Sequence, residues 1–126
     1  MHKILIQFEE LTIQARLNES PTSNEIWKQL PNEGSVNTWG EEIYFEIPVD
    51  MPQESDAREQ VEIGELGYWP VGQAFCIFFG PTPVSTDDRP RAYSPVNILG
   101  EILEDHTQLK SIKNGERVRI ARLEGG

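Results

Sequence analysis

Hydrophobic and polar residues alternate along several stretches of the chain, which is the pattern of strands with one buried face. Residues 3–17 hold two such runs separated by Glu9-Glu10, so we expect an antiparallel hairpin there. In residues 42–49 the odd positions are apolar, whereas the even positions 42, 44 and 46 are Glu, Tyr and Glu. This alternation predicts a strand with one buried and one wet face.

Residues 73–79, QAFCIFF, form the most apolar stretch of the chain and do not alternate. Both sets of alternate positions are apolar: Ala74, Cys76 and Phe78 on one face, and Phe75, Ile77 and Phe79 on the other. A strand of this kind has to be covered on both faces. We therefore expect one face to fill the interior of a barrel and the other to lie under a helix or a loop.

Short elements fill the rest of the chain. A helix is predicted over 21–30, between the capping residue Ser20 and Pro31. Residues 80–95 contain four of the nine prolines and no periodicity, which predicts a long ordered loop. Further elements are expected as strands at 61–69, 96–104 and 116–123, and one helical turn at 107–111. Seven or eight short strands with one or two brief helices indicate an all-β domain, residues 1–126, built as a closed or nearly closed antiparallel barrel.

Composition and charge narrow the classes of partner. The chain has 126 residues and a net charge of −10, with 11 basic and 21 acidic residues. Nucleic-acid binding needs clustered cations, so we expect no nucleic-acid partner. No apolar run reaches the roughly 18 residues of a membrane span, and no signal peptide is evident, so we expect no membrane contact and a cytoplasmic location. The basic stretch 110–122 and the acidic stretch 41–65 are interpreted as solvated faces.

The chemistry-bearing residues give no catalytic or metal-binding constellation. Cys76 is the only cysteine, which excludes an internal disulfide and a cysteine-based zinc site. His106 has no nucleophile signature near it and is interpreted as an exposed turn residue. The acidic residues of 50–59 lack the spacing and the glycine of a calcium loop. We therefore expect no catalytic residues, no metal and no cofactor.

Three separated motifs resemble the small prokaryotic cyclophilin-like family, whose function is not established. They are TWGEEIYFEIPV (38–49), VEIGELGYWPVGQAFCIFFGPTP (61–83) and SPVNILGEI (94–102), and the helix segment NESPTSNEIWKQLP (18–31) follows the same family pattern. The resemblance implies an eight-stranded cyclophilin-type barrel closed at its ends by helices. True cyclophilins, which are prolyl isomerases, use an arginine in a Phe-His-Arg motif. This chain has no such motif, so the resemblance implies at most weak isomerase activity.

Aromatic residues at the strand ends suggest a binding groove at the barrel mouth, because amphipathic rings beside loops are typical of ligand sites. Our first hypothesis is a non-catalytic module for a small molecule or peptide. Its expected ligand-binding residues are Tyr44, Tyr68, Trp69, Phe75, Phe79 and Thr82, with Arg58 at the rim. A weak peptidyl-prolyl isomerase is the second hypothesis. The third is an interaction module that works through strand edges or charged faces, as a monomer or a weak homo-oligomer.

Overall fold

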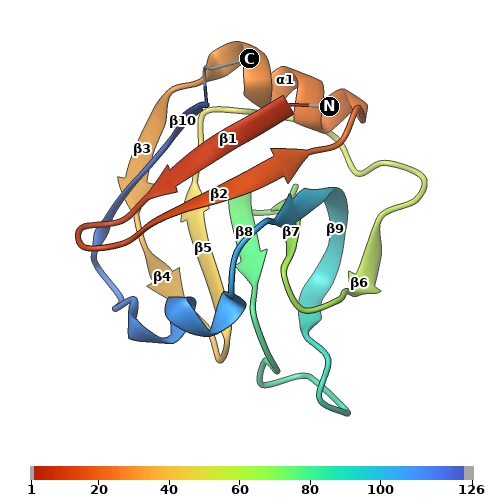
Figure 1. Cartoon of the computed structure of the whole chain (residues 1–126). Helices are drawn as coiled ribbons and strands as arrows, with labels where there is room; N and C mark the ends of the chain where they lie inside the picture. The colour runs from red at the N-terminus through yellow and green to blue at the C-terminus, as the bar shows by residue number, and fades with distance from the viewer. Residues whose placement is uncertain (1, 124–126) are drawn as a thin grey trace.

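The computed structural model describes residues 2–123. Within this range the chain forms ten strands, one α-helix and one 3-10 helix (Figure 1). Their order is β1 His2–Gln7, β2 Thr12–Leu17, α1 Pro21–Gln29, β3 Asn32–Ser35, β4 Asn37–Thr38, β5 Glu42–Glu46, β6 Arg58–Gln60, β7 Glu65–Trp69, β8 Ala74–Phe78, β9 Arg91–Ile102, η1 His106–Ser111 and β10 Arg117–Arg122. All strand pairs are antiparallel among these residues, so the prediction of a mainly β fold is confirmed.

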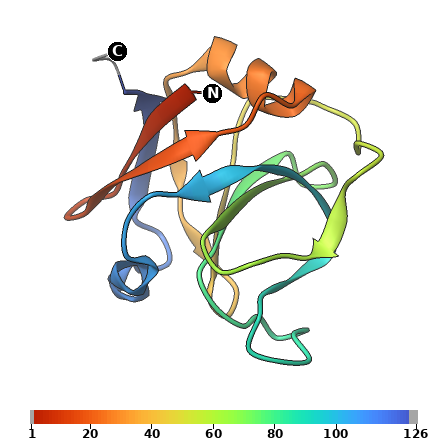
Figure 2. The same ribbon diagram turned by 45° about the vertical axis from the view of Figure 1, so that its right-hand side comes forward.

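The strands form one curled sheet in the order β3-β10-β1-β2-β9-β7-β8-β5-β4, with β6 paired to β9 off this path. The outer strands β3 and β4 are separated in the chain by Val36 alone, so the sheet curls until its ends come together (Figure 2). At this junction β3 packs on β5, and a Cβ on Gly34 would lie 3.4 Å from the Cβ of Phe45. The predicted closed eight-stranded barrel is not confirmed, because ten described strands make a sheet whose hydrogen-bonded path ends at β3 and at β4.

The predicted helix covers one end of the curled sheet (Figure 1). Ser20 caps α1, since its hydroxyl accepts a hydrogen bond from the Ser23 N–H at 3.2 Å. Ile26 is fully buried and joins the inner core. Trp27 stacks on His2 with ring centroids 4.0 Å apart, and the Arg122 guanidinium lies 4.7 Å from the Trp27 ring. These contacts tie α1 to β1 and β10, and the 3-10 helix η1 lies toward the other end of the sheet (Figure 1).

Strand β8 is covered on both faces, as its sequence predicts. The inner core holds Phe75, Ile77 and Phe79, which belong to one cluster with the apolar faces of β1, β2 and β5. On the other face, a second and smaller cluster consists of Val61, Ala74, Cys76, Phe78, Ala92 and Val96. Every residue from 74 to 79 is at most 6% exposed, which confirms the two-sided cover. We call the side of β8 that carries the smaller cluster its outer face.

Strand β9 supplies the cover of this outer face and differs from the predicted element. The sequence predicts a loop over 80–95 and a strand from 96, whereas β9 begins at Arg91. The first half of β9 pairs with β6, with Gln60 opposite Arg91 and Arg58 opposite Val96. This long-range partner stabilises an extended conformation that local periodicity does not reveal, and it shortens the loop to residues 79–90.

Candidate functional site

A pocket of about 210 Å³ opens beside the outer face of β8. Its lining residues come from the β4–β5 turn, β5, the end of β7 and the first half of β9: Trp39, Glu42, Tyr44, Trp69, Ala92, Tyr93 and Val96. The register explains this grouping, because Tyr44 lies opposite Cys76, Glu42 opposite Phe78, and Trp69 opposite Ala74. Paired residues point to the same side of a sheet. The pocket therefore stands above the outer face of β8, formed by Ala74, Cys76 and Phe78.

Four aromatic rings form the walls of the pocket and contact one another in sequence. Trp39 meets Tyr93 with ring centroids 6.1 Å apart, Tyr93 meets Trp69 at 6.3 Å, and Trp69 meets Tyr44 at 6.4 Å. The planes of the three pairs cross at 76°, 83° and 77°, which is edge-to-face geometry. The Trp69 indole N–H donates to the Ser94 hydroxyl at 2.6 Å, and this bond fixes the plane of the ring.

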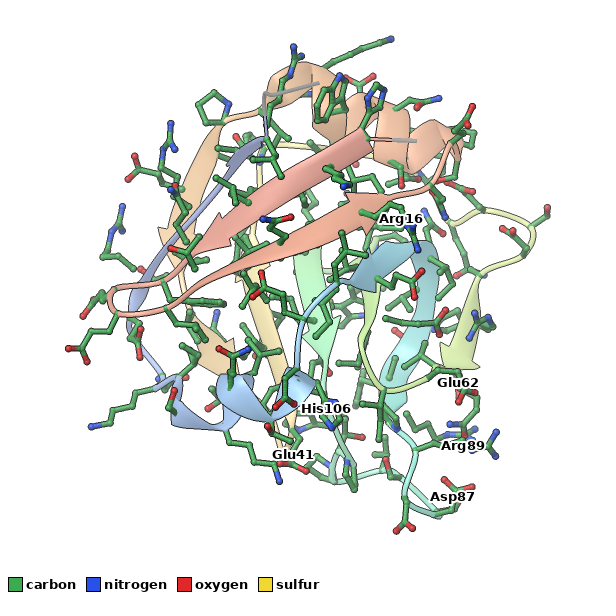
Figure 3. All side chains as sticks on the ribbon, in the orientation of Figure 1. Arg16, Glu41, Glu62, Asp87, Arg89 and His106 are labelled. Carbon is green, nitrogen blue, oxygen red and sulfur yellow. The ribbon has the colours of Figure 1, made fainter. Side chains whose placement is uncertain are left out.

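Glu42 is the acidic group of the pocket. It is 6% exposed, although its place on the polar set of β5 predicts a wet position, and that expectation is wrong for this residue. The reason is that the aromatic walls and β9 cover the outer side of β5. Burial raises the pKa of Glu42 to about 7, and a hydrogen bond with the Cys76 thiol opposes the rise. The neighbouring Glu41 turns toward Lys110 of η1, with 3.9 Å between carboxylate and ammonium (Figure 3).

The loop after β8 holds the turn that carries Trp39. Gly40 has φ +59, and a Cβ there would come within 2.8 Å of the Thr82 Cα, so the turn and the loop are in close contact. The Glu41 N–H donates to the Pro81 carbonyl at 2.9 Å. The Thr82 hydroxyl donates to the Arg91 carbonyl at 2.5 Å, immediately before the pocket-lining part of β9. The loop thus links the two sides of the pocket.

The far end of the same loop is held by ion pairs. Arg89 lies 3.0 Å from the Asp87 carboxylate and 3.7 Å from that of Glu62, and Figure 3 shows the three side chains together. The exposed pair holds the pKa of Asp87 below its usual range, through hydrogen bonds from Arg89. These contacts agree with the predicted ordered loop over 80–95 in its part before β9, which begins at Arg91, although each exposed ion pair contributes little stability.

The structure brings together only part of the residue set that the sequence predicts as a ligand site. Tyr44 and Trp69 line the pocket. Thr82 is 6% exposed and stands behind the pocket, in the contact between loop and β9. Arg58 is exposed and forms a two-bond ion pair with Glu65, at 3.0 and 3.1 Å, outside the pocket lining.

The other three predicted residues belong to the inner core. Tyr68 and Phe75 are fully buried, and Phe79 is 6% exposed. The Phe75 ring stacks on Phe45 with centroids 5.3 Å apart. The Tyr68 hydroxyl donates to the Val49 carbonyl, and burial raises the pKa of this phenol. These three side chains face the interior of the curled sheet and do not line the pocket.

Sequence reasoning missed Trp39, Glu42 and Tyr93. A signal for Glu42 was present, since it lies two residues before Tyr44 on the same face of a strand. Trp39 stands in a turn next to Gly40, and a large ring beside a tight turn is a second usable signal. Tyr93 offered none, because its strand pairing with β6 arises only from long-range contacts.

The described residues 2–123 contain no group of three or more His, Cys, Asp or Glu side chains that could hold a metal ion. No helix in the same range is long and apolar enough to cross a membrane. His106 begins η1 and is partly buried there, outside the pocket lining.

Comparisons with known proteins agree with the motif resemblance. A family model described as "Cyclophilin-like" matches residues 2–121. The solution structure of the hypothetical protein AF2241 from Archaeoglobus fulgidus is similar, with a TM-score of 0.82 and 36% sequence identity over 97% of this chain and 95% of that chain. A search of curated proteins gives no significant match. The family that the sequence motifs suggested is confirmed.

Proposed function

Since the chain belongs to the cyclophilin-like family, we propose that it is a non-catalytic module that binds a small ligand in the aromatic pocket beside β8. The observation that carries the proposal is the pocket itself: four aromatic walls around one buried carboxyl group. Small-ligand sites are typically concave, mostly apolar and equipped with few convergent polar groups. The lining meets each of these conditions.

A binding role is favoured over catalysis by the polar groups near the pocket. Cys76 is 1% exposed, and burial keeps the pKa of its thiol well above the usual value, so it is protonated and inert as a nucleophile. Glu42, with its pKa of about 7, could exchange a proton, as general acids and bases do. However, no second group in the lining is placed as its nucleophile or electrophile. Binding is the simpler use of one carboxyl among aromatic rings.

The prolyl isomerase alternative gains no support from this pocket. Its family arginine has no counterpart in the lining, and Arg58 is engaged with Glu65. A protease-coupled isomerisation assay at high protein concentration separates the two functions. We expect a rate equal to the uncatalysed rate.

The binding proposal is tested with a panel of small organic cations, anions, neutral alcohols and proline-containing peptides, screened by saturation-transfer NMR. We expect at least one compound class to bind the wild type. Removal of one wall by Tyr93→Ala should weaken this binding severalfold, while the fold is retained because the side chain is 72% exposed. Ile63→Ala, at an exposed apolar residue outside the lining, is the matched control and should bind as the wild type does.

Two results would contradict the binding proposal. One is a panel in which no compound binds. The other is binding that Tyr93→Ala and Ile63→Ala change equally, since that would place the ligand elsewhere on the protein.

A further inference from the structure

We propose that the pocket recognises an organic cation, specifically a methylated ammonium head group on a small molecule. This inference rests on the proposed function and adds the chemical class of the ligand. Two independent features support it: the aromatic rings that line the pocket, and the buried acidic group among them, which none of the ion pairs among residues 2–123 includes.

The walls supply the ring types from which cation-binding aromatic cages are built. Neighbouring rings meet edge to face, with centroids 6.1–6.4 Å apart and planes crossing at 76–83°, and all four rings line the same pocket. A cation held in this pocket lies beside several rings, and cation–π attraction acts over about 6 Å. Tryptophan and tyrosine, which form all four walls, have the ring faces that attract cations most strongly.

The carboxyl group of the pocket has no cation of its own. The ion pairs among residues 2–123 join other residues, and none includes Glu42. A buried ionised carboxylate is costly unless a positive group compensates it. A ligand cation would supply this compensation, and the net charge of −10 would favour its approach from solution.

The size and polarity of the pocket favour a methylated ammonium over other cations. Its volume of about 210 Å³ lies below the roughly 300–1,000 Å³ of sites for drug-sized ligands, so it suits a head group of a few heavy atoms. Ala92 and Val96 add apolar surface to the lining and offer no hydrogen-bond acceptor from their side chains. A methylated ammonium makes apolar contacts with this surface, whereas a primary ammonium has three N–H donors to satisfy and would rely on the oxygens of Glu42 and of the tyrosines for them.

The proposal predicts a pH dependence of binding, because a cation prefers the ionised carboxyl group. Three titratable side chains stand around Glu42: Cys76 from β8, Tyr44 from its own strand and Tyr93 from β9. Burial raises the pKa of Cys76 far above neutrality, so this thiol remains protonated over the range of the experiment. The affinity for a cation should therefore rise as Glu42 ionises, around pH 7.

The experiment compares choline with 3,3-dimethylbutan-1-ol, a neutral molecule of the same shape, by isothermal titration calorimetry at pH 6 and pH 8. We expect choline to bind about tenfold more tightly at pH 8, the ratio of ionised Glu42 for a pKa of about 7. The alcohol should bind more weakly than choline at pH 8. A peptide with a trimethyllysine side chain serves as a further arm and should bind more weakly than free choline if the natural ligand is a small molecule.

Two variants separate the contributions of charge and of the rings. Glu42→Gln should remove the pH dependence and lower the choline affinity at pH 8 by more than tenfold, because the tenfold difference between pH 6 and pH 8 requires the protonated wild type to bind choline far more weakly than the ionised one. Tyr93→Leu keeps apolar contact and removes a ring, so it should lower choline affinity about two- to fivefold and leave the alcohol unaffected. Circular dichroism checks that both variants are folded, and Tyr93→Leu alters only an exposed side chain.

The possible failures are distinguishable. If the alcohol binds as tightly as choline at pH 8, or if choline binds more tightly at pH 6, the cation inference is overturned while ligand binding in the pocket stands. If choline, the alcohol and the whole panel fail to bind, both the inference and the proposed function are overturned. Stronger binding of the trimethyllysine peptide than of choline would overturn the assignment to a small molecule.

Discussion

Raising the pH from 4.5 to 8 is expected to lower the free energy of unfolding of this protein by about 3 kcal/mol, through Glu42 alone. Its pKa is about 7 in the folded protein, against the ordinary glutamate value of 4.5 that applies to the unfolded chain. The folded state therefore binds the Glu42 proton more tightly, and the stability contributed by this group is fully present only below pH 4.5. The loss approaches about 1.4 kcal/mol per pH unit midway between pH 4.5 and 7, is about half as steep at either end of this interval, and levels off above pH 7.

Other shifted groups titrate outside this window. The pKa values of Asp87 and Asp105 are lowered by hydrogen bonds from Arg89 and Thr107 respectively, so their stabilising effect is lost only below about pH 4. Burial raises the pKa values of Cys76 and Tyr68, whose effects begin above pH 9. The interval from pH 4.5 to 7 thus reports mainly on Glu42.

Urea denaturation at half-unit pH steps measures this effect. Glu42→Gln should flatten the curve between pH 4.5 and 7 and be more stable than the wild type at pH 8, because it carries no charge to bury. Glu46→Gln, at an exposed position of the same strand, is the control and should keep the wild-type slope. A slope that persists in Glu42→Gln would refute the assignment to this residue.

Replacing Gly100 by alanine is expected to destabilise the protein by about 2–6 kcal/mol. Gly100 has φ +148 and pairs with Leu17, and a Cβ at this position would lie 1.8 Å from the Arg16 carbonyl oxygen. The contact is with backbone, so β2 or β9 has to move. Backbone strain costs about 1–3 kcal/mol and overpacking a further 1–3 kcal/mol.

Gly115→Ala is the matched control for this substitution. Gly115 also has a positive φ of +94, but nothing lies within 4 Å of its would-be Cβ. The free energy of unfolding of Gly115→Ala should therefore fall only by the cost of backbone strain, about 1 kcal/mol. Thermal or urea unfolding of the two variants measures the difference. If the two substitutions lowered the free energy of unfolding equally, the close approach of β2 and β9 at Gly100 would be absent in solution.

Much of the fold could be predicted from the sequence because its strands carry local signals. The β1–β2 hairpin, the Ser20 cap and the two-sided burial of β8 each follow from the alternation or capping pattern of a few neighbouring residues. Closure of the sheet could not be predicted in the same way. It depends on how β3 and β5 meet, and Gly34 allows contact there without a hydrogen-bonded ladder.

Only two of the four aromatic walls of the pocket could be predicted from the sequence, for a related reason. Tyr44 was recognisable because it lies on the polar side of its strand, and Trp69 because it stands at a strand end beside a loop. Tyr68, the same residue type as Tyr44, and the aromatic Phe75 face the interior, and aromatic character alone does not tell the two faces apart. The wall formed by Tyr93 requires β9 to pair with β6, and no local pattern encodes this pairing.

The most direct test of the account uses the indole N–H resonances of the three tryptophans in a ¹⁵N-labelled sample titrated with choline. Trp39 and Trp69 line the pocket, whereas Trp27 lies on α1 between His2 and Arg122. We predict that the Trp39 and Trp69 signals shift together along one saturable curve and that the Trp27 signal stays in place. Movement of Trp27 alone, or equal movement of all three, would contradict a ligand site beside β8.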